Sequence, residues 1–314
     1  MPQDSTYILN SFSDTTGLPD SIRQLVRETA GSINKSGKII LPAIESDQQV
    51  IWRFLTIFLV AATIYILLRY WRYRYLTNKL NVEYDQKKGV YDGILANHNP
   101  YYRSLNAEAK DRFIKRTILF IEAKEFECVG MDMEDEMPVL ISAAAIQLTF
   151  GLQDFLLNYF NKIYILKNRY RYENASVPYE GNVSPEGIYL SWIDFLREYG
   201  DYTDGENVGL HEMAHALVYV NFTVTDGEDE SFRKKFYDFS PIGRPIMEKM
   251  QAGQTNLLDK YAATNFEEFW AVCIETFFEK PVPFREQLPD LYNSLCHLLN
   301  QDPTTSGKIL RPLA

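Results

Sequence analysis

Histidine, cysteine and positive charge are scarce in this chain. Its 314 residues include 4 histidines and 3 cysteines, and 42 Asp and Glu outnumber 32 Lys and Arg, which gives a formal net charge of −10. The deficit of positive charge argues against general nucleic-acid binding, which needs clustered Lys and Arg. The cysteines are too few and too far apart for a disulfide framework or a paired zinc site, and they fit a reducing compartment: Cys128, Cys273 and Cys296.

Long apolar runs are scarce as well, and the main one lies at residues 54–68. It contains no charged side chain over fifteen residues. Trp52 precedes the run, and aromatic residues alternate with arginines after it, as is typical at the ends of a membrane-spanning helix. Counted over residues 51–71, the run approaches the length needed to cross a hydrocarbon core of about 30 Å. The alternative is a buried core helix, because the strictly apolar part is short.

The basic residues around this run predict its orientation. Three precede it, at positions 35, 38 and 53, and six follow it, at positions 69, 72, 74, 79, 87 and 88. The excess of Lys and Arg after the run predicts that the C-terminal side lies in the cytoplasm. We therefore expect a single-pass protein of the cytoplasmic membrane, with a polar leader (1–50), a transmembrane helix (51–71), a basic juxtamembrane linker (72–96) and a cytoplasmic globular domain (97–314).

Hydrophobic spacing predicts a helix-rich α+β domain with a small sheet. Helices are expected at residues 107–126, 138–160, 201–220 and 265–278, and a short one at 21–30 in the leader. Strands are expected at residues 162–166 and 187–192, with a loop between them, and a charged loop is expected at 226–231. Thr203 or Asp204 is expected to cap the helix at 201–220.

Two of the four histidines lie in the sequence His-Glu-Met-Ala-His at residues 211–215. Residues four apart share one face of a helix, so His211 and His215 can offer two imidazole nitrogens to one zinc ion. Glu212 lies beside the same metal and can act as general base on a zinc-bound water. The alternative is a pair of ordinary helix histidines. Ligand type favours zinc, although the same set could hold another divalent metal.

A catalytic zinc needs a third protein ligand and an open position. His98 and His297 are candidates by residue type, but neither lies in a motif. Carboxylates are better candidates, either in the acidic loop (Glu228, Asp229 and Glu230) or on the downstream apolar helix (Glu267, Glu268 and Glu275). An unpaired charge on that helix would be costly, and metal ligation would remove the cost. Residue chemistry alone does not separate Glu267 from Glu268.

Several segments follow one another in a distinctive order, and they read GIYLSW (187–192), GENVGLHEMAH (205–215), YAATNFEEFWAVCIETFFEKP (261–281), PDLY (289–292) and QDP (301–303). In order and spacing they resemble the Mlc titration factor A family of zinc-dependent peptidases. The resemblance extends over roughly residues 97–303. That family resembles in turn the catalytic domain of anthrax lethal factor, which implies a zincin-like, gluzincin fold for the domain.

The resemblance implies a role for each matching residue. The zinc ligands would be His211, His215 and Glu268. Glu212 would be the general base, and the Tyr261 hydroxyl would stabilise the oxyanion of the tetrahedral intermediate. Glu275 would orient a ligand histidine, unless it is only a structural carboxylate. An edge strand would pair with an extended peptide substrate, unless it serves only the sheet, and its residues would be Gly187, Ile188, Tyr189, Leu190, Ser191 and Trp192.

Together these features predict a membrane-anchored zinc metallopeptidase that acts on a peptide or protein substrate. The main alternative is a non-catalytic, membrane-tethered regulator that sequesters a cytoplasmic protein such as a transcription factor, a partner suggested only by family analogy. An intramembrane protease is rejected, because acidic residues precede the motif instead of a hydrophobic span. Ala216, Leu217 and Val218 depart from the small polar and Asp residues that the family has after its second motif histidine.

Overall fold

The computed structural model describes residues 20, 24, 47–171, 178–224, 229–305 and 308–311. The chain divides into two compact units, Met1–Arg74 and Tyr75–Ala314. Most of the leader, including the helix expected at residues 21–30 apart from Gln24, lies outside the described residues, and so does the first half of the charged loop, which includes Glu228.

One continuous helix, α2 (Asp47–His98), contains both the apolar run and the basic segment after it. Side chains along the apolar run are exposed, among them Trp52 and Trp71. In length and composition, the helix meets the requirements for crossing a membrane. The segment expected as a linker is helical throughout, and its Tyr84 and Leu95 are buried in the second unit. The folded unit therefore begins at Tyr75, earlier than the expected boundary at Asn97.

The second unit contains a four-stranded sheet with the order β1-β2-β4-β3. Strands β1 (Glu125–Val129), β2 (Lys162–Leu166) and β4 (Gly187–Ser191) run parallel, with Phe126 opposite Ile163 and Ile163 opposite Ile188. Strand β3 (Gly181–Ser184) pairs antiparallel to β4. The short antiparallel pair of β5 (Gln301–Asp302) and β6 (Lys308–Ile309) forms a separate sheet.

The expectation of an edge strand at residues 187–192 is wrong. Strand β4 lies between β2 and β3, and Trp192 begins the next helix. Ile188 and Leu190 are fully buried, and Gly187 and Ser191 are buried as well, as is usual for a strand covered on both faces. The two edge strands are β1 and β3, and β3 lies in the segment expected to be a loop.

Helices make up most of the second unit. They are α3 (Pro100–Ser104), α4 (Ala107–Glu122), α5 (Glu136–Thr149), α6 (Trp192–Gly200), α7 (Val208–Val218), α8 (Glu230–Gln251), α9 (Phe266–Glu279), α10 (Pro281–Gln287) and α11 (Pro289–Leu299). A π-helical turn (Tyr219–Thr223) continues α7, and short 3-10 turns lie at Lys260–Ala263 and Pro303–Thr305. The expected small sheet in a helix-rich domain is confirmed.

Two of the expected helices are shorter than hydrophobic spacing suggested. The helix expected at 107–126 ends at Glu122, because the chain turns there into β1. The helix expected at 138–160 ends at Thr149, where the buried Arg116 donates hydrogen bonds to the carbonyl oxygens of Thr149 (3.1 Å) and Leu152 (2.9 Å). A buried guanidinium with several donors can satisfy carbonyl groups that a helix C-terminus leaves without partners.

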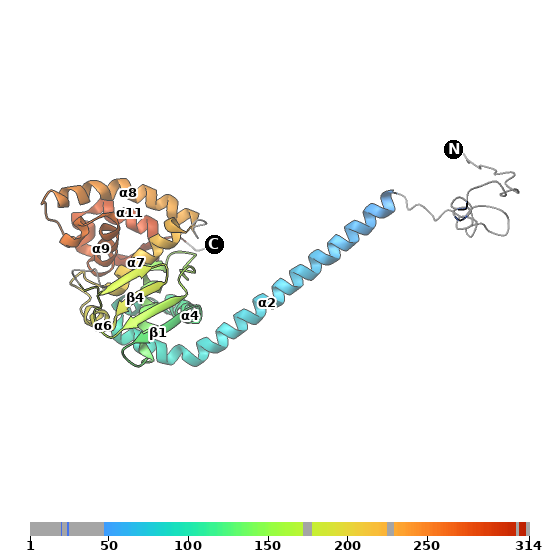
Figure 1. Ribbon diagram of the computed structural model, residues 1–314, viewed down its shortest axis with the longest axis horizontal. Coiled ribbons are helices and arrows are strands. Elements are labelled where there is room, and N and C mark those ends of the chain that lie inside the picture. The colour runs from blue at the N-terminus through green and yellow to red at the C-terminus, as the bar shows by residue number, and fades with distance from the viewer. Residues whose placement is uncertain are drawn as a thin grey trace. The chain divides into compact units, whose positions relative to one another are not determined.

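Helix α7 lies at the centre of the second unit. It packs against α5, α9, β3 and β4. Figure 1 shows α7 between the sheet and the layer formed by α8, α9 and α11. The fully buried Trp270 of α9 donates a hydrogen bond from its indole nitrogen to the Ala214 carbonyl oxygen at 2.9 Å, which fixes α9 against α7. The His-Glu-Met-Ala-His motif is thus on a helix held on both sides.

Candidate metal centre

Helix α7 begins at Val208, with Asn207 as its cap. The Asn207 side-chain oxygen accepts a hydrogen bond from the Leu210 backbone N–H at 2.9 Å. The caps expected from sequence, Thr203 and Asp204, lie in a turn before the helix, which includes Gly205 at a φ of 78°. This start places His211 in the first turns of α7.

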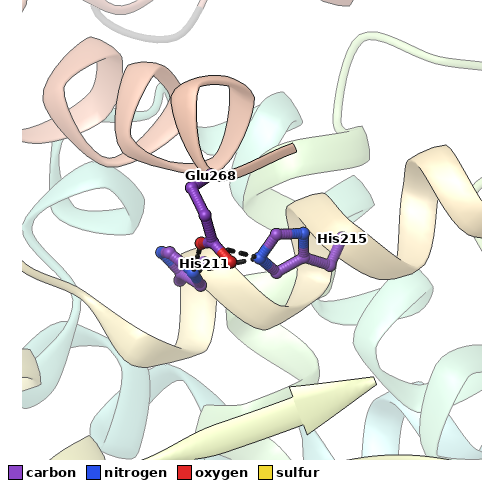
Figure 2. Close-up of side chains that lie close together, drawn as sticks. All are labelled: His211, His215 and Glu268. Carbon is purple, nitrogen blue, oxygen red and sulfur yellow. Dashed lines mark hydrogen bonds and ion pairs between the residues drawn. The ribbon is translucent and has the colours of Figure 1, made fainter. Parts of the chain in front are cut away.

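Three donor atoms from two helices converge on one point. His211 Nε2 and His215 Nε2 lie 3.0 Å apart on α7. Glu268 Oε2, from the first turn of α9, lies 3.0 Å from His211 Nε2 and 3.4 Å from His215 Nε2. Figure 2 shows the Glu268 carboxylate reaching across from its own helix to the two imidazole rings. The structure thus brings Glu268, and not its neighbour Glu267, to the two histidines.

This donor set fits a tetrahedral metal ion. Bonds of 2.0–2.1 Å to nitrogen place the ligand atoms of a tetrahedral zinc about 3.3 Å apart, close to the separations among the three atoms here. Two imidazoles and one carboxylate are also a common protein ligand set for catalytic zinc. Among the described residues, the other group with metal-ligand spacing is Glu180, Asp194 and Glu198, and Arg169 and Arg197 form ion pairs with it.

Glu275 fixes the orientation of His211. Its Oε1 lies 2.6 Å from His211 Nδ1, which leaves Nε2 directed at Glu268. Its Oε2 accepts a hydrogen bond from the Asn207 backbone N–H at 3.0 Å. Asn207 in turn donates from its side chain to Glu279 Oε1 at 2.9 Å. The buried carboxylates of α9 thus link His211 to the start of α7.

Glu212 is buried beside the donor atoms. Its Oε2 has no hydrogen-bond partner among the described residues, which is unusual for a buried carboxylate oxygen. Space for the side chain comes from β3, where a Cβ atom on Gly181 would lie 2.6 Å from the Glu212 carboxyl carbon. An unpartnered buried oxygen next to a candidate metal position is what a general base needs, because it can take a proton from an incoming water.

The ionisable groups of the site influence one another strongly. Burial disfavours a charged imidazole at His211, yet the carboxylates of Glu275 and Glu268 raise its pKa well above the usual range. Burial also opposes ionisation of Glu268, but hydrogen bonds from His211 and His215 lower its pKa to about 2. Burial raises the pKa of Glu212 to about 7, against the effect of the two histidines. Three carboxylates around two imidazoles make this a site that attracts a cation.

Tyr261 lies at the edge of the same site. It belongs to the 3-10 turn before α9, its ring centroid is 6.1 Å from that of His211, and it is 51% exposed. Burial of the phenol and the nearby Glu268 and Glu212 raise its pKa to about 12, so the hydroxyl keeps its proton at neutral pH. A phenol that keeps its proton can donate a hydrogen bond to an oxygen that gains negative charge.

The remaining candidates for a third ligand lie elsewhere. His98 is next to Glu136, 4.0 Å away, and His297 is on α11. Asp229 caps α8, where its side chain accepts a hydrogen bond from the Phe232 N–H, and Glu230 begins that helix. None of these side chains belongs to the group of donor atoms around His211.

Two cavities meet at the metal centre and form one cleft. One has a volume of about 440 Å³ and the other about 720 Å³, and both are lined by Gly181, His211, Glu212 and Tyr261. Edge strand β3 contributes Gly181, Asn182 and Val183 to the wall of the smaller cavity. Strand β4, which the sequence suggested as the substrate-binding strand, contributes no residue to the lining of either cavity.

Comparison with known proteins identifies the class to which this site and fold belong. The chain belongs to the glucose-regulated metallo-peptidase M90 family, whose profile matches residues 71–299. It is 30% identical over 137 residues to Mlc titration factor A of Cronobacter sakazakii, and 31% identical over 122 residues to that of Escherichia fergusonii. The resemblance to the Mlc titration factor A family is therefore confirmed.

The extent of these similarities differs between relatives. The Cronobacter alignment covers 41% of this chain and 51% of its relative, and the Escherichia alignment covers 37% and 45%. The chain thus matches about half the length of these Mlc titration factors. An uncharacterized protein of Synechocystis is 24% identical over 224 residues, which is 65% of this chain and 81% of that protein.

Glu275→Gln tests how His211 is held. We expect metal affinity to fall by about 10- to 100-fold, because a partner that fixes the orientation and basicity of a ligand histidine contributes on that scale. Competition with a chelating dye measures the affinity. Glu279→Gln is the matched control, since Glu279 bonds to Asn207 but not to His211. Equal losses of affinity in both variants would assign Glu275 a structural role only.

Proposed function

We propose that this chain is a membrane-anchored zinc peptidase with a zincin-like, gluzincin domain. The observation that carries the proposal is the convergence of His211, His215 and Glu268, with the unpartnered Glu212 oxygen beside them in an open cleft. The M90 family assignment supports a metallopeptidase. In this proposal the three side chains hold zinc, and Glu212 is the general base.

Zinc bound by these ligands would polarise the scissile carbonyl and make water a better nucleophile. Glu212 accepts a proton from the attacking water at its free Oε2 and later transfers it to the leaving amine. Tyr261 donates its hydroxyl hydrogen to the oxyanion from the rim of the cleft. Glu275 holds His211 in place throughout, through the bond to Nδ1.

The substrate in this proposal is an extended peptide that lies along β3. That strand is at the edge of the sheet and lines the cleft next to Glu212. Extended peptides commonly bind proteins by adding a strand to such an edge. A strand at this position would place a backbone carbonyl near the three donor atoms, with side chains directed alternately into the cleft and away from it.

Anchoring in the cytoplasmic membrane is supported by the first part of α2. The large apolar side chains between residues 54 and 68 are exposed, and the charged residues Arg53 and Arg69 bound this run. An apolar helix surface of this length is costly in water and favourable in lipid. Basic residues that follow the apolar run outnumber those before it, which supports a peptidase domain on the cytoplasmic side.

The experiment is a peptidase assay on washed membranes that carry the full chain. We expect cleavage of a peptide mixture to remain with the membranes after an alkaline wash, to stop with a zinc chelator and to return with added zinc. Activity released by the wash would contradict anchoring, and activity unaffected by the chelator would contradict the metal mechanism. If zinc-loaded membranes cleave no peptide, the non-catalytic regulator becomes the better reading.

A further inference from the structure

The two ends of the cleft differ in chemistry. The larger cavity is lined by acidic side chains, including Glu180, Glu206 and Asp259. Its one arginine, Arg169, forms ion pairs with Asp194 (3.0 Å) and with Glu180. The smaller cavity is walled instead by aromatic rings, those of Tyr219, Phe222, Phe236, Phe266 and Trp270. A substrate that spans the metal centre therefore meets an acidic surface on one side and an apolar one on the other.

The aromatic wall is packed and continuous. The ring of Phe236 lies 5.1 Å from that of Phe222 and 5.2 Å from that of Trp270, centroid to centroid. Phe236 and Trp270 are buried, while Phe222 and Phe266 are partly exposed to the cavity. Partly exposed rings supported by buried ones form a rigid surface, which favours a large apolar side chain over a polar one.

Apart from the two motif histidines, Arg244 is the one basic residue among those that line this cavity. Its guanidinium carbon lies 4.3 Å from the centre of the Phe266 ring, and its Nε donates to Ser240 Oγ at 3.0 Å. In the described part of the chain it forms no ion pair with a carboxylate. The contacts with Phe266 and Ser240 hold the planar group while its two terminal nitrogens stay available for a bidentate carboxylate.

We propose that Arg244 binds a carboxylate of the peptide substrate, so that the enzyme selects peptides with a large apolar residue next to the cleaved bond and an acidic group beyond it. This inference rests on the proposed peptidase function. The carboxylate is a Glu or Asp side chain or the C-terminus of the peptide. The chain has a net charge of −10, so most of its surface repels an anionic group. The positive charge of Arg244 therefore makes this cavity a favourable position for a substrate carboxylate.

One carboxylate acts against this selection. Glu267 is exposed and lines the same cavity, so it repels an acidic substrate residue. Removing its charge should therefore strengthen the preference for acidic peptides, whereas removing the charge of Arg244 should abolish it. The opposite effects of these two substitutions distinguish charge recognition in this cavity from a general change in stability.

The test uses the zinc-loaded full chain in detergent and a peptide series. Each peptide carries one Phe, and a single Glu, Gln or Lys is moved along both sides of it, with free or amidated C-termini.

We expect Glu to be preferred to Gln by about fivefold in kcat/KM at one position, which is the effect of a solvent-accessible ion pair. In Arg244→Gln the ratio should fall to about one, and in Arg244→Glu a Lys peptide should be preferred. Lys249→Gln, an equal charge change on exposed α8 surface outside both cavities, should leave the ratio unchanged.

Binding is measured in parallel by fluorescence anisotropy with the same peptides and the Glu212→Gln chain. If the wild type cleaves and prefers acidic peptides, but Arg244→Gln keeps that preference, the inference is overturned and the peptidase function is supported. No cleavage, together with an Arg244-dependent preference in binding, contradicts the peptidase and supports the carboxylate site. A preference for amidated or basic peptides overturns the inference, and no cleavage with no preference in binding overturns both.

Discussion

Glu212→Gln is expected to lower kcat by about 10³- to 10⁴-fold while the bound metal stays in place. Glutamine has nearly the shape of glutamate but cannot accept a proton, and general base catalysis contributes up to about 10⁴-fold. The space for the side chain is set by Gly181, so an isosteric replacement fits without moving β3. None of the three converging donor atoms belongs to Glu212, which is why metal binding should be unaffected.

The measurement is a cleavage assay with elemental analysis of the same samples. Glu248→Gln is the control, because it makes the same change on the exposed surface of α8, outside both cavities. Wild-type turnover in Glu212→Gln at full metal content would remove the proposed mechanism. Loss of activity together with loss of metal would instead show that Glu212 supports the ligand helix and would leave the identity of the base open.

The pairing of the two motif histidines was predictable because helical periodicity is local, whereas their carboxylate partners were singled out only by the family resemblance. Residues four apart share a helix face in any context, so the pairing of His211 with His215 follows from sequence alone. Residue chemistry left Glu267 and Glu268 as equal candidates, because neighbouring residues on a helix differ only in the direction they face. Tertiary packing decides between them: α9 packs on α7, and Glu268 Oε2 lies 3.0 Å from His211 Nε2.

The edge strand that lines the cleft, β3, was not predictable for a different reason. Strand β3 is four residues long, begins with Gly181 and carries little apolar pattern, whereas β4 is strongly apolar. Apolar pattern reports burial, and the most buried strand of a small sheet is an interior one. Gly181 itself gives one retrospective signal, since a residue without a side chain allows the close approach of Glu212.

Helix α8 escaped prediction because its sequence argues against a helix. Pro241 and Pro245 lie inside it, and each removes a backbone hydrogen bond. Packing offsets this cost: a Cβ atom on Gly243 would lie 2.7 Å from the Phe269 ring, so glycine allows α8 to pack closely on α9. Such a contact joins residues that are distant in sequence, and local propensity contains no information about it.

Glu268→Gln is expected to lower metal affinity by more than about 100-fold, because loss of a direct ligand should exceed the 10- to 100-fold effect of losing a partner of a ligand. An amide oxygen is neutral and a weaker ligand than the carboxylate, which carries its charge at neutral pH because hydrogen bonds from His211 and His215 lower its pKa to about 2. His211→Ala should have at least as large an effect, since it removes one ligand and leaves the buried Glu275 without its partner.

Equilibrium competition against a zinc chelator measures the affinity, and elemental analysis gives the stoichiometry. We expect about one zinc per wild-type chain, full occupancy in Glu267→Gln, and little or none in Glu268→Gln and His211→Ala after dialysis against the chelator. The neighbouring residue is a stringent control, because Glu267 has the same charge and lies in the same first turn of α9. Zinc retained in Glu268→Gln and lost in Glu267→Gln would mean that α9 turns its other carboxylate to the metal, and the proposed ligand set would be wrong.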